Sequence, residues 1–116
     1  PVFIYDYPAE KGALARCRPD KPGLAERFEA CIGGLEICNG FTELVDPYEQ
    51  RSRFEAEIER RKEHGLQLYP MPEAFLKSLC RMPPSAGNAL GLDRLVMLLA
   101  DAATIDEVTA FLPEEY

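Results

Sequence analysis

Alternating apolar and polar residues predict strands in the first half of the chain. Residues 1–5 form one such run, and residues 27–32 and 35–44 alternate on either side of Gly33 and Gly34. A two-residue turn between antiparallel strands needs positive φ angles, so the two glycines predict a β-hairpin. The first strand starts with no cap or leader before it, which favours a piece of something longer.

Helix signals follow. Asp46, Pro47 and Glu49 form a capping-box pattern. It predicts a helix from residue 47 to about His64, ended by Gly65. This segment has few apolar positions, so we expect a solvated helix that lies over the sheet and is supported by ion pairs four residues apart.

The rest of the chain adds shorter elements. Residues 71–80 predict a second helix, 86–91 an apolar strand of small residues, and 92–100 a buried helix that is apolar on most sides. A second capping-box pattern at 104–107 predicts a short helical turn. Strands joined by a hairpin, with no regular strand–helix alternation, predict an α+β fold: an antiparallel β-sheet flanked by helices.

Composition narrows the class of protein. The 116 residues suit one domain, and the net charge of −7 argues against a general nucleic-acid surface. No apolar run is long enough to span a membrane. The four cysteines include no CxxC pair and His64 is the only histidine, so the spacing does not suit zinc. We therefore expect reduced thiols in a cytoplasmic protein.

Glu29 and Glu36 stand on the two strands of the predicted hairpin. Strict alternation pairs Glu29 with Cys38, which puts both glutamates on one face as diagonal neighbours about 7–8 Å apart. Two carboxylates repel unless something positive lies between them, and Mg²⁺ is a suitable partner. The alternatives are an ion pair with Arg27 or Arg16, or exposure to water.

Asn39, Phe41 and Glu43 follow at alternate positions of the second strand. They suit an ammonium group, because the carboxylate supplies charge, the ring shields it and the amide fixes its orientation. Strict alternation puts them on the face opposite Glu36, so a shared pocket requires a β-bulge, which Gly40 would permit. The alternative is a strand with one polar edge and a turn at Asn39-Gly40.

Arg94 lies in the first turn of the last predicted helix, behind the small residues of SAGNALG. The helix dipole favours anions there, so an anionic ligand such as a phosphate explains this Arg better than the helix does. The few side chains before Gly91 would let a planar or phosphorylated ligand approach the backbone. The alternative is an ion pair with Asp93 or Asp101.

Three stretches resemble the C-terminal part of the catalytic domain of class II lysyl-tRNA synthetases: DYPAEKGALAR, ERFEACIGGLEICNGFTEL and ALGLDRLVMLL. The last is similar to motif 3 of that class, a strand and helix carrying an Arg. The resemblance implies a catalytic domain built on an antiparallel sheet. Motifs 1 and 2, which supply the dimer contact and a further Arg, are missing from residues 1–116. We therefore expect a fragment, inactive alone, of a homodimeric enzyme.

The resemblance also implies roles for individual residues. The positions that match the family's ATP site are Glu29, Glu36, Ile37, Gly91 and Arg94. Among them, Glu29 and Glu36 match the carboxylates that hold magnesium, and Arg94 matches the Arg that acts in catalysis. Asn39, Phe41 and Glu43 match the lysine-binding segment, with Glu43 at an amino group of the substrate.

Ala89 departs from the synthetase pattern. Lysyl-tRNA synthetases resemble GxGxG here, whereas the related ligases that join β-lysine to elongation factor P resemble ALGxDRLVML, with alanine at this position. A methyl group would narrow the amino-acid pocket and favour the β isomer. We therefore expect an enzyme that activates lysine or β-lysine with ATP and Mg²⁺ and transfers it to a lysine of elongation factor P. The alternatives are a lysyl-tRNA synthetase acting on tRNA-Lys and a non-catalytic synthetase-like binding module.

Overall fold

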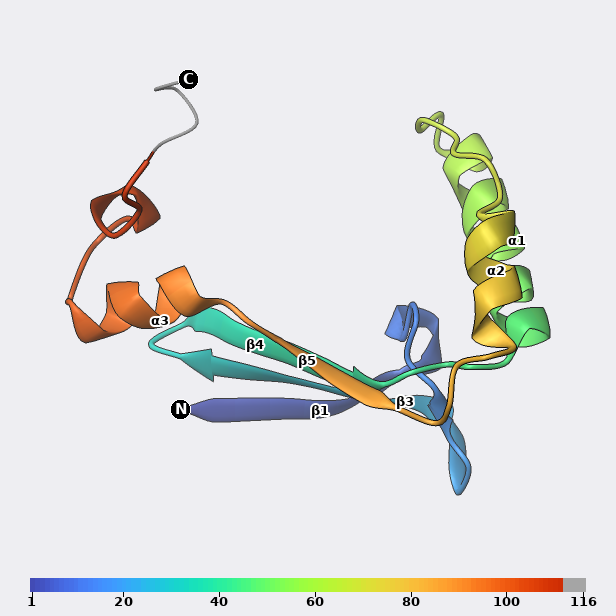
Figure 1. Cartoon of the computed structure of the whole chain (residues 1–116), viewed down its shortest axis with the longest axis horizontal. Helices are drawn as coiled ribbons and strands as arrows, with labels where there is room; N and C mark the ends of the chain where they lie inside the picture. Colours follow the sequence, from blue (N-terminus) through green and yellow to red (C-terminus); the bar gives the residue numbers. More distant parts are fainter. Residues whose placement is uncertain (112–116) are drawn as a thin grey trace.

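The computed structural model describes residues 1–111 and builds them around an antiparallel sheet of five strands (Figure 1). The strands β1 (Val2–Pro8), β3 (Lys21–Ile32), β4 (Leu35–Thr42) and β5 (Ala86–Leu90) lie in the order β1-β3-β4-β5. A short strand, β2 (Cys17–Arg18), pairs with β3. The predicted α+β class with an antiparallel sheet is confirmed.

The helices occupy the two ends of this sheet (Figure 1). They are α1 (Pro47–Glu63), α2 (Glu73–Leu79) and α3 (Leu92–Leu99), together with the 3₁₀ turns η1 (Ala9–Lys11) and η2 (Ile105–Glu107). Each begins and ends close to its predicted bounds, except η1, which no local pattern indicated.

Local hydrogen bonds explain where α1 begins and ends. The Asp46 carboxylate accepts two backbone N–H groups of the first turn, at 2.8 and 3.2 Å. Glu49 does not close the predicted capping box, because its carboxylate accepts from Arg53 at 2.6 Å. The helix stops before Gly65, whose φ of +62° is the left-handed value expected of a helix terminator. At η2 the predicted capping box is complete.

The position of α1 differs from the prediction. It packs against α2, with the rings of Phe54 and Phe75 6.0 Å apart, and both helices stand beside one end of the sheet rather than over it (Figure 1). Leu76 and Leu79 of α2 are buried. The narrow apolar side of α1 matches a short helix, whereas covering a sheet face would need a wider one.

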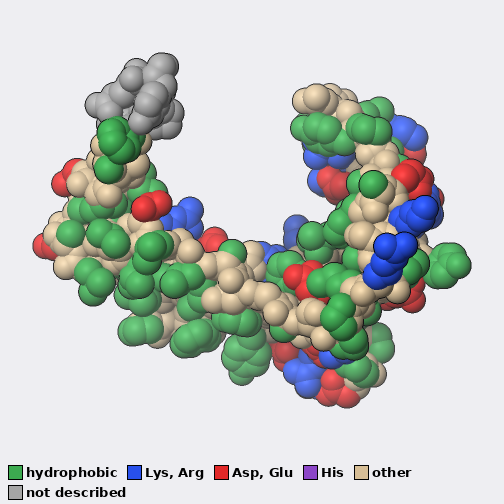
Figure 2. Space-filling view, viewed as in Figure 1, with side chains coloured by type: hydrophobic (Ala, Val, Ile, Leu, Met, Phe, Trp, Pro, Cys, Tyr) green, Lys and Arg blue, Asp and Glu red, His purple; other side chains and the backbone are tan. Residues whose placement is uncertain are grey.

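Few side chains are buried. The buried apolar residues are Ala15, Ala25, Ile37, Leu44, Leu76 and Leu79. The Cα radius of gyration is 17.5 Å, against the about 13 Å typical of a compact domain of 100 residues. Figure 2 shows hydrophobic side chains exposed along the sheet. Residues 1–111 thus form an open assembly with much of its apolar surface uncovered.

The expected burial of the last helix is wrong within the described residues. None of the residues of α3 is buried, and Leu92 and Leu99 are 64% and 81% exposed. The helix lies at the start of β4, next to the hairpin turn, and mainly contacts β4 and η2. An apolar helix has the capacity for burial, and residues 1–111 supply too few neighbours to bury it.

Gln50 is a buried polar residue in the same structure. It is 1% exposed and lies beside a cavity of about 710 Å³ between η1 and α1. Its side-chain N and O atoms have no hydrogen-bond partner within residues 1–111. An unsatisfied buried amide of this kind costs about 1–3 kcal/mol.

Two kinds of feature are absent from residues 1–111: a membrane-spanning helix and a cluster of metal-ligating side chains. Across residues 1–111, no helix combines the length and apolar character needed to cross a membrane. In the same range, no three or more His, Cys, Asp or Glu side chains gather as a metal site. Cys17, Cys31, Cys38 and Cys80 are free thiols, as predicted.

Candidate functional site

The hairpin of β3 and β4 carries most of the candidate residues. Gly33 and Gly34 form its turn with φ angles of +59° and +82°, which confirms the predicted tight turn. From the turn, the strands pair in the predicted register as far as Cys31 and Glu36. The two predicted strands are therefore joined as the sequence indicates.

Beyond that pair the register changes. Ala30 pairs with Cys38, so β4 has one extra residue, Ile37. Glu29 consequently pairs with Asn39, and the predicted pairing of Glu29 with Cys38 is wrong. The β-bulge that a shared pocket requires exists, although it lies at Ile37 rather than at Gly40. The side chain of Ile37 is 5% exposed, so the bulge places an apolar group in the core.

Gly40 has a different role. A Cβ atom at this position would lie 2.6 Å from Cε1 of Phe28, the residue opposite on β3, and 3.0 Å from Oδ1 of Asn88 on β5. The glycine therefore makes room for an aromatic ring that lies across the strand.

The bulge places the predicted ligands on one face of the sheet. Directly paired residues share a face and side chains alternate along each strand. The pairings on either side of the bulge therefore put Glu36, Glu29, Asn39 and Phe41 on the same side. On β5, Ala89 lies opposite Asn39 and Gly87 lies opposite Phe41, so these two positions join the same face.

Glu36 and Glu43 are half-buried carboxylates without a cation. Across residues 1–111, no Lys, Arg or His forms an ion pair with either, and no side-chain hydrogen bond reaches their carboxylate oxygens. A Cβ at Gly87 would lie 3.3 Å from Oε1 of Glu43, which locates this carboxylate beside β5. Since unpaired charge in a half-buried place is unfavourable, both carboxylates are suited to bind a positive ligand.

Glu29 is held by Arg27, one of the two alternatives that the sequence left open. Nη2 of Arg27 lies 2.5 Å from Oε1 of Glu29, and Nε donates to Oδ1 of Asn39 at 3.2 Å. The guanidinium lies 4.4 Å from the centre of the Tyr7 ring. Burial, and then the hydrogen bond to Glu29, raise the pKa of Tyr7. The sequence did not predict the contact of Arg27 with Asn39 or the packing of its guanidinium against the Tyr7 ring.

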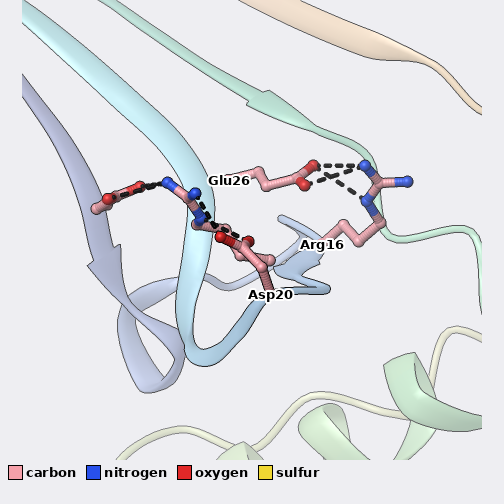
Figure 3. Close-up of polar contacts among 5 residues, drawn as sticks. Arg16, Asp20 and Glu26 are labelled. Atoms are coloured by element: carbon pink, nitrogen blue, oxygen red, sulfur yellow. Dashed lines mark hydrogen bonds and ion pairs between the residues drawn. The ribbon is translucent and has the colours of Figure 1, made fainter.

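The other candidate partner, Arg16, is engaged elsewhere. Its guanidinium contacts both oxygens of Glu26 at 2.8–3.0 Å (Figure 3). This excludes Arg16 as the cation that neutralises Glu29 or Glu36. Arg18 forms ion pairs with Asp6 and Asp20, each at 2.9 Å.

The side chain of Arg94 binds the backbone of the hairpin. Its Nη1 donates to the carbonyl oxygen of Glu36 at 2.8 Å, and the N–H of Gly91 donates to that of Ile37 at 2.8 Å. Within residues 1–111, Arg94 forms no ion pair with Asp93 or any other acid. The side chain lies against Gly91, where a Cβ would be 3.2 Å from its Cδ. Arg94 itself therefore covers the open backbone that we expected at Gly91.

These residues fit a magnesium ion that arrives with a nucleotide. Mg²⁺ in proteins commonly takes one or two carboxylates together with substrate phosphates. Glu36 offers a carboxylate with no cation among the described residues, and Arg27 occupies Oε1 of Glu29 only. The exposed guanidinium of Arg94 at the same end of β4 suits the phosphates.

The chain is similar to known proteins over almost its whole length. Residues 1–115 match the profile of tRNA synthetases class II (D, K and N). The lysine–tRNA ligases of Prochlorococcus marinus strain MIT 9303 and of Nostoc punctiforme are 48% identical to the chain over 112 residues. That of Synechococcus strain RCC307 is 50% identical over 112 residues. These matches cover 96% of this chain and 20–22% of the relatives, so the chain spans about a fifth of their length.

Proposed function

Because the chain belongs to the class II tRNA synthetases (D, K and N), we propose that it forms the C-terminal part of the catalytic domain of a lysine–tRNA ligase. The full-length enzyme activates lysine with ATP, releases pyrophosphate, and transfers the lysyl group from the adenylate to tRNA-Lys. One observation carries the proposal: the half-buried Glu36 and Glu43 have no cation within residues 1–111, and Arg94 binds the carbonyl oxygen of Glu36.

Lysine binding is assigned to the β4 side of the site. Glu43 binds a substrate ammonium group, because a charge-assisted hydrogen bond satisfies a carboxylate that no internal cation satisfies. The ring of Phe41 shields that charge from water. Asn39 orients the substrate, and Ala89 lies opposite it on β5.

Nucleotide binding is assigned to the turn end of the hairpin and the start of α3. Glu29 and Glu36 would hold Mg²⁺, which neutralises phosphate charge when it is bound. Arg94 contacts the phosphates and stabilises the charge that develops there during adenylate formation. Ile37 and Gly91, linked by a backbone hydrogen bond of 2.8 Å, form the edge at which the adenosine lies.

The test of this proposal is Glu43→Gln in the full-length enzyme. Loss of a charged hydrogen-bond partner costs about 1.5–3 kcal/mol, so lysine should bind about 10–150-fold more weakly. ATP affinity should stay within about twofold, because Glu43 lies outside the proposed nucleotide site. Calorimetry measures both. The control is Glu55→Gln, an exposed carboxylate of α1. Equal weakening of lysine and ATP would remove Glu43 from the amino-acid pocket.

The acyl acceptor requires its own experiment. The relatives named above are lysine–tRNA ligases, which supports tRNA-Lys as the acyl acceptor. The sequence pattern around Ala89 instead predicts elongation factor P as the acceptor. Ala89 is the observation that supports elongation factor P as a second candidate. Transfer of labelled lysine and β-lysine to tRNA-Lys and to elongation factor P separates the two. Failure of pyrophosphate exchange with either amino acid would instead support a non-catalytic module.

Ala89→Gly tests the basis of that second candidate. If the methyl group narrows the pocket, its removal should raise activation of lysine relative to β-lysine by about 5–150-fold, the usual worth of one methyl group. Pyrophosphate exchange with each isomer gives the ratio. A ratio unchanged within about twofold would leave Ala89 as a packing residue and would withdraw the second candidate.

A further inference from the structure

Arg27 joins the two halves of the proposed site through one guanidinium group. Nη2 binds Oε1 of Glu29 at 2.5 Å, Nε binds Oδ1 of Asn39 at 3.2 Å, and Nη1 binds the carbonyl oxygen of Lys11 at 2.9 Å. The face of the group lies 4.4 Å from the centre of the Tyr7 ring. Arg27 is thus fixed from several sides, and it contacts one residue assigned to magnesium and one assigned to lysine.

The contact with Asn39 decides which way its amide points. A guanidinium only donates hydrogen bonds, so the atom of Asn39 that faces Arg27 must be the oxygen. The Nδ2 atom, with its two N–H groups, then points away from Arg27. Asn39 therefore offers donors to a ligand and is suited to a carboxyl oxygen of the amino acid rather than to its ammonium group.

The contact with Glu29 limits how that carboxylate can bind a metal. Arg27 supplies a positive charge beside Oε1, at a contact in which the side chains of Arg27 and Glu29 are 20% and 17% exposed. An incoming cation therefore meets a carboxylate that is already neutralised, with Oε2 not used by Arg27. An internal Arg of this kind weakens metal binding at Glu29 while it holds the carboxylate in place.

We propose that Arg27 is a positioning residue that orients Asn39 toward the carboxyl group of lysine and restrains Glu29 from binding magnesium too tightly. This inference rests on the proposed function, and it adds a residue that touches neither substrate. It makes a distinctive prediction. Loss of Arg27 should weaken lysine binding and strengthen Mg²⁺ binding, whereas a simple loss of structure should weaken both.

The experiment uses Arg27→Gln and Arg27→Lys in the full-length enzyme, with Arg16→Gln as the control. Arg16 also forms a two-oxygen ion pair with a glutamate of β3, Glu26, whose side chain alternates with that of Arg27 along the strand (Figure 3). For Arg27→Gln we expect KM for lysine, and its Kd measured by calorimetry without ATP and Mg²⁺, to rise about 5–30-fold. The half-saturating Mg²⁺ concentration in pyrophosphate exchange should fall about 2–10-fold. Arg27→Lys restores the charge, so the Mg²⁺ requirement should return toward that of the parent while KM for lysine stays high.

Each outcome of this experiment decides the matter. Opposite shifts for lysine and Mg²⁺ support the inference. Parallel weakening of both, or shifts no larger than those of Arg16→Gln, would overturn it and leave the proposed function intact. If Arg27→Gln does not fold, Arg27→Lys still tests the inference. A high KM for lysine at an unchanged Mg²⁺ requirement supports it, and an unchanged KM for lysine overturns it. A parent enzyme that fails to activate lysine would overturn the proposed function and this inference together.

Discussion

Gly87→Ala adds one methyl group beside the carboxylate assigned to the lysine ammonium. Gly87 lies opposite Phe41 in the β4–β5 ladder, and a Cβ there would lie 3.3 Å from Oε1 of Glu43. The backbone has no positive φ at this position, so alanine introduces no backbone strain. The substitution therefore acts on the position of one carboxylate.

The size of the effect follows from that distance. An ordinary contact between a methyl group and an oxygen is a few tenths of an ångström longer than 3.3 Å. Glu43 must therefore move by about that amount, which lengthens its hydrogen bond to the ammonium group. Overpacking of this degree costs about 1–2 kcal/mol, so lysine affinity should fall about 5–30-fold. ATP affinity should stay the same, because Gly91 and Arg94 lie at the other end of β5.

Calorimetry with lysine and with ATP on the full-length enzyme measures both effects. The matched control is Gly23→Ala, because a Cβ at Gly23 would meet nothing within 4 Å. A double-mutant cycle with Glu43→Ala tests the route: once the carboxylate is gone, the added methyl group should cost nothing further. A Gly87→Ala enzyme that binds lysine as the Gly23→Ala enzyme does would refute the placement of Glu43, as would an equal loss of ATP affinity.

Three further substitutions test the fold by thermal unfolding of the full-length enzyme. Gly40→Ala should destabilise it by about 1–3 kcal/mol, because its Cβ would lie 2.6 Å from the Phe28 ring, and Phe28→Leu should relieve much of that loss; a neutral Gly40→Ala would contradict the close approach of the ring to the glycine. Asp46→Ala should cost about 1 kcal/mol through loss of the helix cap, and an unchanged melting temperature would show that α1 does not depend on it. Gln50→Leu should raise the melting temperature, because it removes a buried amide that lacks a partner within residues 1–111, whereas a lower one would show that the amide is satisfied in the full-length enzyme.

The parts of the fold that local chemistry determines could be predicted from the sequence. The glycines at the hairpin turn, the Asp46 cap and the stop at Gly65 all act within a few residues, and each lies where expected. Burial of α3 could not be predicted in the same way. Its apolar residues give it the capacity to pack, but burial also requires a neighbour, and Leu99 remains 81% exposed.

The sequence predicted that Glu29 and Glu36 share a face of the hairpin, which the strand pairings confirm, but it did not predict the register beyond Cys31 and Glu36. The bulge at Ile37 has no glycine or other local signal, because it depends on the packing of a side chain that is 5% exposed. The spacing of Arg27 and Glu29 was a usable signal, since residues two apart on a strand share a face. The further link from Arg27 to Asn39 depends on pairing across strands, which spacing along one strand does not reveal.

The two-residue turn at Gly33 and Gly34 also bears on the order in which the chain folds. Glu29, Glu36 and Asn39 belong to one hairpin, whose strands are close in sequence and whose formation takes about 1–10 μs. Ala89 and Arg94 enter only when β5 pairs with β4, a contact across a much longer loop and a correspondingly slower step. A hairpin alone is marginally stable in water. The hairpin that brings Glu29 and Glu36 together therefore forms early and opens repeatedly, and the pairing of β5 with β4 stabilises it.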